Sequence, residues 1–286
     1  MPSLVPVSTA FHLRRTYSPP YNYPPDMVLK AMDGVLFYVH RHLLEYKSDN
    51  GFGGIFAGDM NTGPHDSLPI YMIAEASTVV NCMLHILYKM SSRLYAPDLP
   101  TISETFRALR GYGCSLSENI PQGSEIFTDL IAHVADPNSD ALEVFKIAAS
   151  NSFEELAVPS SFYALRTPIP SIDEATAVAI GPTYMLRLSK LHDNRLLALK
   201  NLLQELPDIH EDMPACDSVK QRRLRTSYYL LGAQLACRGE PFITGAWLGA
   251  CYEKLIQEVG CNTCKGKIRD QVRNIVEKWE QVEKTI

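Results

Sequence analysis

The segment Met27-Val-Leu-Lys-Ala-Met-Asp-Gly-Val-Leu-Phe-Tyr-Val39 decides the fold that the sequence predicts. Two apolar runs, 27–32 and 35–39, flank the dipeptide Asp33-Gly34. Asp-Gly is favoured in two-residue hairpin turns, because both of its positions can take positive φ. The segment therefore predicts an antiparallel β-hairpin closed by a tight turn.

The chain after the hairpin predicts helices and one further strand. Two short helical segments and a third strand are expected at 40–46, 51–57 and 68–73. Over 75–89 apolar residues recur at helical spacing, and 101–112 predicts a second helix of similar length. Residues 95–100 contain two prolines, so they predict the connector between these two helices.

From residue 124 onward nearly the whole chain predicts helices. The three prolines within 159–177 mark a candidate boundary in this part. Beyond it, helices are expected at 183–206, 218–238, 244–259 and 267–284. The last of these carries an apolar stripe, which indicates that it packs against its own domain.

Composition limits the class of protein. A chain of 286 residues with 46% hydrophobic residues can bury a sizeable core, and its length suits two domains. A net charge of -5 provides no attraction for nucleic acid or anionic lipid.

Residues 1–23 lack the apolar core of a signal peptide, and no apolar stretch is long enough to span a bilayer. Seven cysteines, an odd number, suit reduced thiols, so we expect a cytoplasmic or nuclear protein without nucleic-acid or membrane partners.

The order of the expected elements over residues 24–120 resembles the BTB/POZ domain, a protein–protein interaction module. The first strand follows Asp26, as in the family, and Gly34 opens the second strand. None of the matching elements is specific by itself, but five of them occur in the right order and spacing. The residues that carry the resemblance in the strand and helices are Phe37, His40, Leu44, Phe56, Leu84 and Tyr88.

This resemblance implies an α+β chain in three parts. Residues 1–23 would form an irregular N-terminal arm, 24–120 the BTB/POZ domain, and 121–286 a helical extension similar to that of fungal BTB proteins. The family implies dimerisation with another copy or another BTB protein, and in some members recruitment of a cullin-type ubiquitin ligase or a transcriptional corepressor. Cullin-binding members carry an apolar-x-Glu motif after the helix pair. Here residues 58–63 contain Met60 but no Glu two positions later, which counts against cullin recruitment.

Dimerising zinc-finger members of the family have a charged pocket, formed by an Asp at the first strand and an Arg just after the His. Asp26 and Arg41 match these two positions. The simpler interpretation, which we favour, is that Asp26 caps the start of the strand and Arg41 is a solvated helix residue. His40 is expected to be half-buried and to hydrogen-bond nearby backbone rather than to carry protons in catalysis.

Cys261-Asn-Thr-Cys264 is the sole Cys-x-x-Cys segment of the sequence. Two thiolates at this spacing can share one tetrahedral metal ion, and a closed structural site needs two more ligands. Cys216 and His210 are the obvious candidates, with Cys251 next, but they have no paired spacing of their own. We therefore favour a turn between two helices with unengaged thiols, and no cofactor, over a structural zinc site.

The run Lys220-Gln-Arg-Arg-Leu-Arg225 is the strongest basic cluster. It suits a nuclear import signal or a phosphate-contacting face, and equally a helix turn with solvated charges. No hydrolase or metalloprotease motif is present. We therefore expect a protein–protein interaction module and no enzyme. The alternative is an enzyme or a zinc-stabilised domain built by the C-terminal helices, and a deep pocket around Cys261, Cys264 and His210 would favour the enzyme.

Overall fold

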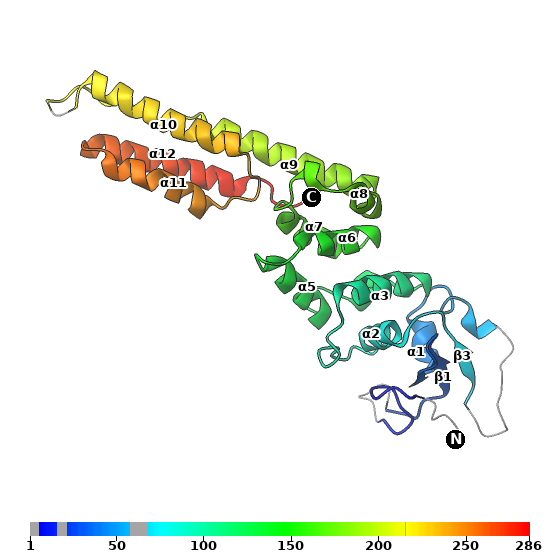
Figure 1. The fold of residues 1–286 in the computed structure, drawn as a ribbon. Helices are drawn as coiled ribbons and strands as arrows, with labels where there is room; N and C mark the ends of the chain where they lie inside the picture. Colours follow the sequence, from blue (N-terminus) through cyan, green and yellow to red (C-terminus); the bar gives the residue numbers. More distant parts are fainter. Residues whose placement is uncertain (1–5, 16–21, 58–67, 215) are drawn as a thin grey trace. The chain divides into compact units, whose positions relative to one another are not determined.

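A computed structural model describes residues 6–15, 22–57, 68–214 and 216–286 of the chain. The fold is α+β, as predicted: one small sheet is followed by a long series of helices (Figure 1). The chain forms two compact units, one from residues up to 136 together with 151–155, the other from 137–150 together with 156–286. The boundary expected near 120 lies within the first unit, and the segment 159–177 lies within the second.

The structure describes three strands in the sheet of the first unit. Strand β1 (Met27–Lys30) pairs antiparallel with β2 (Leu36–Val39) and parallel with β3 (Ile70–Met72). The order is therefore β2-β1-β3, with β1 in the centre. The first three residues of β1 are buried, as expected of a central strand with both edges paired. The predicted hairpin and the third strand are both confirmed.

The turn of the hairpin differs from the prediction. The Ala31 N–H donates to the Val35 carbonyl at 3.0 Å, and the Gly34 N–H donates to the Ala31 carbonyl at 2.9 Å. Gly34 has φ +89°, whereas Asp33 is not among the residues with positive φ. The loop is therefore a wider turn that needs one left-handed glycine, and the predicted two-residue turn is wrong.

Asp33 has another role in this turn. Its carboxylate accepts hydrogen bonds from the Ser77 hydroxyl at 2.6 Å and from the Ser77 N–H at 3.2 Å. Ser77 is the first residue of α2 (Ser77–Leu87), so the hairpin turn is tied to the start of that helix. The Ser77 hydrogen bond lowers the pKa of Asp33, because it stabilises the ionised carboxylate.

The N-terminal arm covers the outer edge of β2. The Ser8 N–H donates to the Leu36 carbonyl at 2.9 Å, and the Tyr38 N–H donates to the Phe11 carbonyl at 3.0 Å. The Phe11 side chain is fully buried and contacts Phe37. The described part of the arm is irregular, as expected, but it belongs to the packed structure of the first unit.

The helices of the first unit lie close to their predicted positions. The second helical segment, expected over 51–57, consists of turns that end in the short 3-10 helix η1. Helix α3 begins at Leu99 inside the expected connector, because the Asp98 carboxylate caps it through the Thr101 N–H at 2.9 Å. The helices are α1 (Arg41–Tyr46), η1 (Ile55–Ala57), α2, α3 (Leu99–Gly111), α4 (Leu116–Asn119) and α5 (Glu125–Ala135).

The remaining elements are helical. Helix α10 has the predicted bounds, whereas α12 begins at residue 262 rather than 267. The elements are α6 (Ala141–Ser150), α7 (Glu154–Ala164), η2 (Ile169–Ser171), α8 (Glu174–Ile180), α9 (Pro182–Leu203), α10 (Ser218–Arg238), α11 (Gly245–Glu258) and α12 (Asn262–Gln281). Among the described residues, none of these helices combines the length and the apolar character that crossing a membrane requires.

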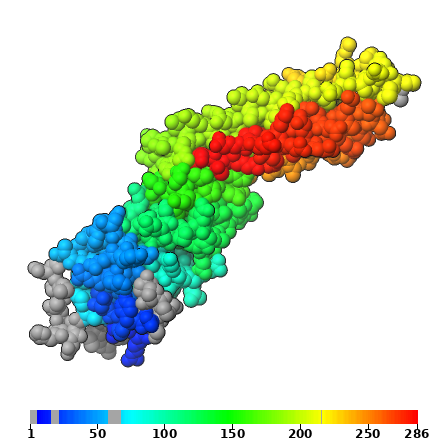
Figure 2. Space-filling view, turned by 180° about the vertical axis from the view of Figure 1, so that it is seen from behind, coloured from blue at the N-terminus to red at the C-terminus, as the bar shows by residue number. Residues whose placement is uncertain are grey.

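Helices α9 to α12 share one core in the second unit, and α12 lies alongside α9 and α11 (Figures 1 and 2). Trp279 of α12 is almost fully buried there. The guanidinium of Arg195, also buried, lies 4.3 Å from the centre of the Trp279 ring. Arg195 Nε donates to the Pro241 carbonyl at 2.7 Å, so this buried charge is compensated by hydrogen bonds as well as by the ring.

We expect Gly113→Ala to lower the free energy of unfolding by about 1–3 kcal/mol, because it places a side chain in the left-handed region. Gly113 has φ +70°, and an added Cβ would lie 2.3 Å from Asp49 Oδ1. Gly111→Ala is the matched control, since an added Cβ there meets no atom within 4 Å. Urea unfolding followed by circular dichroism measures both variants. Equal stabilities of the two variants would show that the turn after α3 does not require glycine at position 113.

Candidate metal centre

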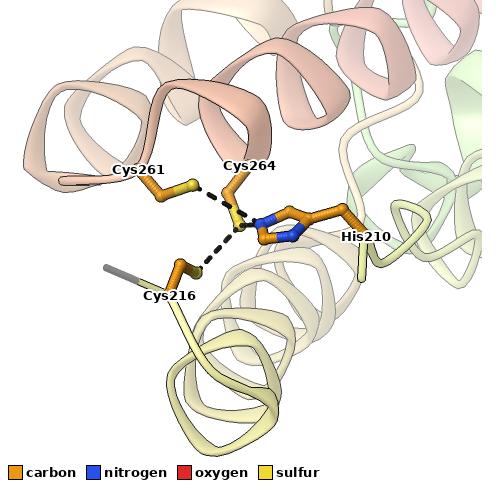
Figure 3. A group of neighbouring side chains, drawn as sticks. All are labelled: His210, Cys216, Cys261 and Cys264. Atoms are coloured by element: carbon orange, nitrogen blue, oxygen red, sulfur yellow. Dashed lines mark hydrogen bonds between the residues drawn. The ribbon is translucent and has the colours of Figure 1, made fainter. Parts of the chain in front are cut away.

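Four side chains of the second unit converge on one point (Figure 3). They are His210, Cys216, Cys261 and Cys264, and their donor atoms all lie within 4.8 Å of one another. His210 Nε2 is 3.1 Å from Cys264 Sγ and 3.4 Å from Cys261 Sγ. The Sγ atoms of Cys216 and Cys264 are 3.6 Å apart.

These distances suit a tetrahedral metal site. Zinc binds sulfur at about 2.3 Å and imidazole nitrogen at about 2.0–2.1 Å. Tetrahedral angles then separate two sulfurs by about 3.8 Å, and a sulfur from a nitrogen by about 3.6 Å. The three distances given above differ from these values by about half an ångström or less. The cluster can therefore bind a metal ion such as zinc, with three thiolates and one imidazole as ligands.

The start of α12 positions two of the ligands. Cys261 is the N-cap residue and Cys264 stands in the first turn, so that both thiols reach the same side of the helix end (Figure 3). The sequence predicts this segment as a turn between helices. The helix begins earlier than predicted, and this early start brings the two sulfurs together.

The connection between α9 and α10, residues 204–217, supplies the other two ligands. Met213 and Cys216 exchange two backbone hydrogen bonds of 3.1 and 2.9 Å, which fold the chain back at this point. His210 lies six positions before Cys216, and because the chain folds back here, both side chains reach the same cluster. Cys251, the next candidate in the sequence, lies outside the cluster.

Hydrogen bonds orient the imidazole of His210. Nδ1 lies 2.6 Å from the Glu211 carbonyl, to which only a protonated Nδ1 can donate, so in the neutral ring Nε2 is the nitrogen that is available to a metal. The buried side chain of Gln221 holds the His210 backbone: its Oε1 accepts from the His210 N–H and its Nε2 donates to the His210 carbonyl, both at 3.0 Å. Nothing in the sequence pattern indicates this role of Gln221.

The thiols of the cluster differ in acidity. The pKa of Cys261 is lowered to about 6, mainly by the hydrogen bond from the Cys264 backbone N–H at the helix start. Burial raises the pKa of Cys216, and it raises that of Cys264 to about 12. Thiols bind metal as thiolates, so metal binding has to release protons from the two buried thiols.

Asp26 and Arg41 are adjacent in the first unit. The Asp26 carboxylate accepts from the Arg41 backbone N–H at 2.8 Å and so caps the start of α1. The Arg41 guanidinium pairs with Glu45 at 2.9 Å and lies 5.0 Å from the centre of the Phe56 ring. Within one chain the carboxylate therefore contacts the backbone of Arg41, and the charged pocket of a dimer remains a prediction.

The residues that carry the BTB resemblance lie in the interior of the first unit, with one exception. Phe56 is half-buried and packs edge-to-face against Tyr71. Residues 58–63, where cullin-binding members carry their motif, lie outside the described residues. The buried residues of this set are Phe37, His40, Leu44, Leu84 and Tyr88.

His40 links the end of β2 to the end of α2. Its Nε2 donates to the Tyr23 carbonyl at 2.9 Å, and its Nδ1 lies 2.9 Å from the Tyr88 hydroxyl. The same hydroxyl accepts from the His40 backbone N–H, also at 2.9 Å. His40 is fully buried rather than half-buried, and this burial lowers the pKa of its imidazole.

No protein-family model, no curated protein and no solved structure matches this chain. The resemblance to BTB/POZ domains therefore remains a prediction from residues and element order. The candidate metal centre depends on none of these comparisons, because it rests on the residue types and the geometry of its four side chains.

We expect the stability of the protein to fall as the pH is lowered from 7 towards 5. The pKa of His40 is lower in the folded chain than in the unfolded one, so below about 6.5 the unfolded state binds more protons. The neutral His40 ring therefore contributes its full stability above the pKa that His40 has in the unfolded chain. This contribution is lost as the pH falls towards the pKa that His40 has in the folded chain. Urea unfolding at several pH values should show a smaller loss for His40→Gln than for the wild type. An equal pH dependence of the two proteins would contradict this role of His40.

Proposed function

We propose that this protein is a non-enzymatic binding protein whose first unit pairs with a second polypeptide, in the first instance another copy of the chain. The observation that carries this proposal is the outer edge of β3, where two apolar residues are exposed beside backbone groups that no other described strand pairs. The resemblance to BTB/POZ domains supports the same function. Roles as a ubiquitin-ligase adaptor or a transcriptional co-regulator are extensions of the proposal that rest on the resemblance alone.

The two edges of the sheet differ. The Val28 N–H donates to the Pro69 carbonyl, and the Ile73 N–H donates to the Lys30 carbonyl. A parallel ladder uses every second residue of a strand, so Ile70 and Met72 direct their backbone groups away from β1. Among the described residues, no strand pairs with that side of β3, whereas the arm covers the outer edge of β2.

Side chains on the β3 edge suit a protein partner. Ile70 is 42% exposed and Met72 is 60% exposed. An added strand would satisfy the backbone groups of both residues, and its side chains would cover this apolar surface. An edge of this kind is otherwise a liability in a soluble protein, which supports the interpretation that another polypeptide covers it.

We expect light scattering to give a mass of about twice 32.0 kDa for the wild type at high micromolar concentration. Ile70→Lys with Met72→Lys should shift the protein to the monomer, since two lysines on an edge strand oppose pairing. Met32→Lys is the matched control, because Met32 is 70% exposed in the hairpin loop, outside the strands. Melting curves verify that the variants fold. A monomeric wild type, or equal dimerisation of the edge variant and the control, would count against the proposal.

We further propose that the second unit holds one structural Zn²⁺ at His210, Cys216, Cys261 and Cys264. Four protein ligands close a tetrahedral site, whereas catalytic zinc keeps one position open for water or substrate. A cavity of about 460 Å³ adjoins His210, but none of the three cysteines lines it. The ion would join the 204–217 connection to the start of α12, which favours a stabilising role over catalysis.

We expect the purified protein to contain one zinc ion per chain by elemental analysis. Zn²⁺ added to metal-free protein should raise the free energy of unfolding by about 4 kcal/mol when free Zn²⁺ is a thousandfold above Kd. Cys264→Ser should abolish this gain, whereas Cys237→Ser should retain it, since Cys237 is exposed and lies outside the cluster. Retention of the zinc-dependent gain by Cys264→Ser would refute the assignment, as would a wild type that binds no zinc.

A further inference from the structure

The cavity beside His210 has features of a ligand site. It measures about 460 Å³, within the range of small-molecule sites. One wall is the start of α10, and the other is the connection from Leu206 to Asp212. His210 and Gln221 both line it, and the hydrogen bonds of the Gln221 amide to the His210 backbone join the two walls.

Two arginines of α10 give the cavity its charge. Arg222 and Arg225 stand three residues apart, hence on one helix face, and both line the cavity. Among the described residues, neither forms an ion pair. The Nε atom of Arg225 is buried and has no hydrogen-bond partner in the described structure. A guanidinium with an unsatisfied donor is costly to bury, and an anion bound to the accessible part of the same group would offset part of that cost.

The remaining lining residues indicate what else the ligand carries. Leu206 and Ile209 form an apolar wall of the cavity. Leu206 is 37% exposed and Ile209 is 58% exposed. Tyr229 contributes a half-exposed ring, and the hydroxyls of Tyr229 and Ser218 add two further donors. An anionic group attached to an apolar body fits this combination of arginines, hydroxyls and apolar side chains.

We infer that this cavity binds a small organic phosphate monoester, with its phosphoryl group on Arg222 and Arg225 and its apolar body against Leu206 and Ile209. A phosphate monoester has three terminal oxygens and up to two negative charges, which suit two guanidinium groups with additional hydroxyl donors. A carboxylate has one charge and two oxygens, so it would use fewer of these donors.

This inference gives a role to the basic run 220–225 of the sequence. Helix α10 contains five basic residues and no acidic residue over 218–238. Asp212 also lines the cavity and opposes an anion, so Asp212→Asn should strengthen binding. The site goes beyond the proposed function: it does not depend on the β3 edge, and the arginines are present whether or not a metal is bound.

Calorimetric titration of the full chain with phenyl phosphate tests the site. We expect saturable binding of one molecule per chain, at least about tenfold tighter than that of benzoate or inorganic phosphate. Arg222→Gln and Arg225→Gln should each weaken binding about tenfold or more. Arg223→Gln removes the same charge from a residue that is exposed and outside the lining, so it should leave the affinity unchanged.

Nuclear magnetic resonance provides a local readout. Phenyl phosphate should shift the Nε–H resonance of Arg225 in the wild type and in Arg223→Gln. The same titration with phenyl phosphate, carried out with and without Zn²⁺, separates this site from the metal centre. Three results would overturn the inference: no saturable binding, benzoate binding as tightly as phenyl phosphate, or an equal loss of affinity in Arg223→Gln and Arg225→Gln. The last would indicate general charge attraction by the helix.

Discussion

The chemistry of the second unit depends on one contact, that of the connection between α9 and α10 with the first turn of α12. The described residues of the connection, 204–214 and 216–217, form no regular helix or strand, so their position depends on the contacts that they make. The cluster of three thiols and an imidazole lies at this contact, and the Gln221 amide secures His210 from the side of α10. A four-coordinate metal ion would replace weak contacts between these side chains by strong bonds, and would thereby fix both the connection and one wall of the adjoining cavity.

The first unit is organised around the central strand β1. The arm occupies one edge of the sheet and buries its own Phe11, while β3, with exposed apolar side chains, is the other edge among the described residues. This asymmetry gives the unit a direction in which a second polypeptide can add. The proposed binding surface and the metal centre belong to different units, so a defect in one need not affect the other.

Sequence patterns predicted the elements better than the contacts between them. Two apolar runs around Asp33-Gly34 located the hairpin, helical spacing located most helices, and the bounds of α10 agree with the prediction. The turn at Asp33 was predicted wrongly, since Gly34 has positive φ whereas Asp33 does not, and the Asp33 carboxylate instead binds Ser77, forty-four residues away. The Cys-x-x-Cys segment was assigned to a turn, since the helix start at residue 262 has no strong local signal.

Local physical chemistry along the chain was sufficient for the α+β class, since hydrophobic periodicity and turn residues act over a few positions. The residue types in the sequence also pointed to the four candidate metal ligands. The prediction nevertheless favoured thiols that bind no metal, because His210 and Cys216 show no paired spacing. Only the folding of distant segments onto one another placed these side chains within 4.8 Å and put Arg222 and Arg225 beside an apolar wall. The reason is that metal coordination and ligand binding depend on distances in space, and the order of residues along the chain does not give these distances.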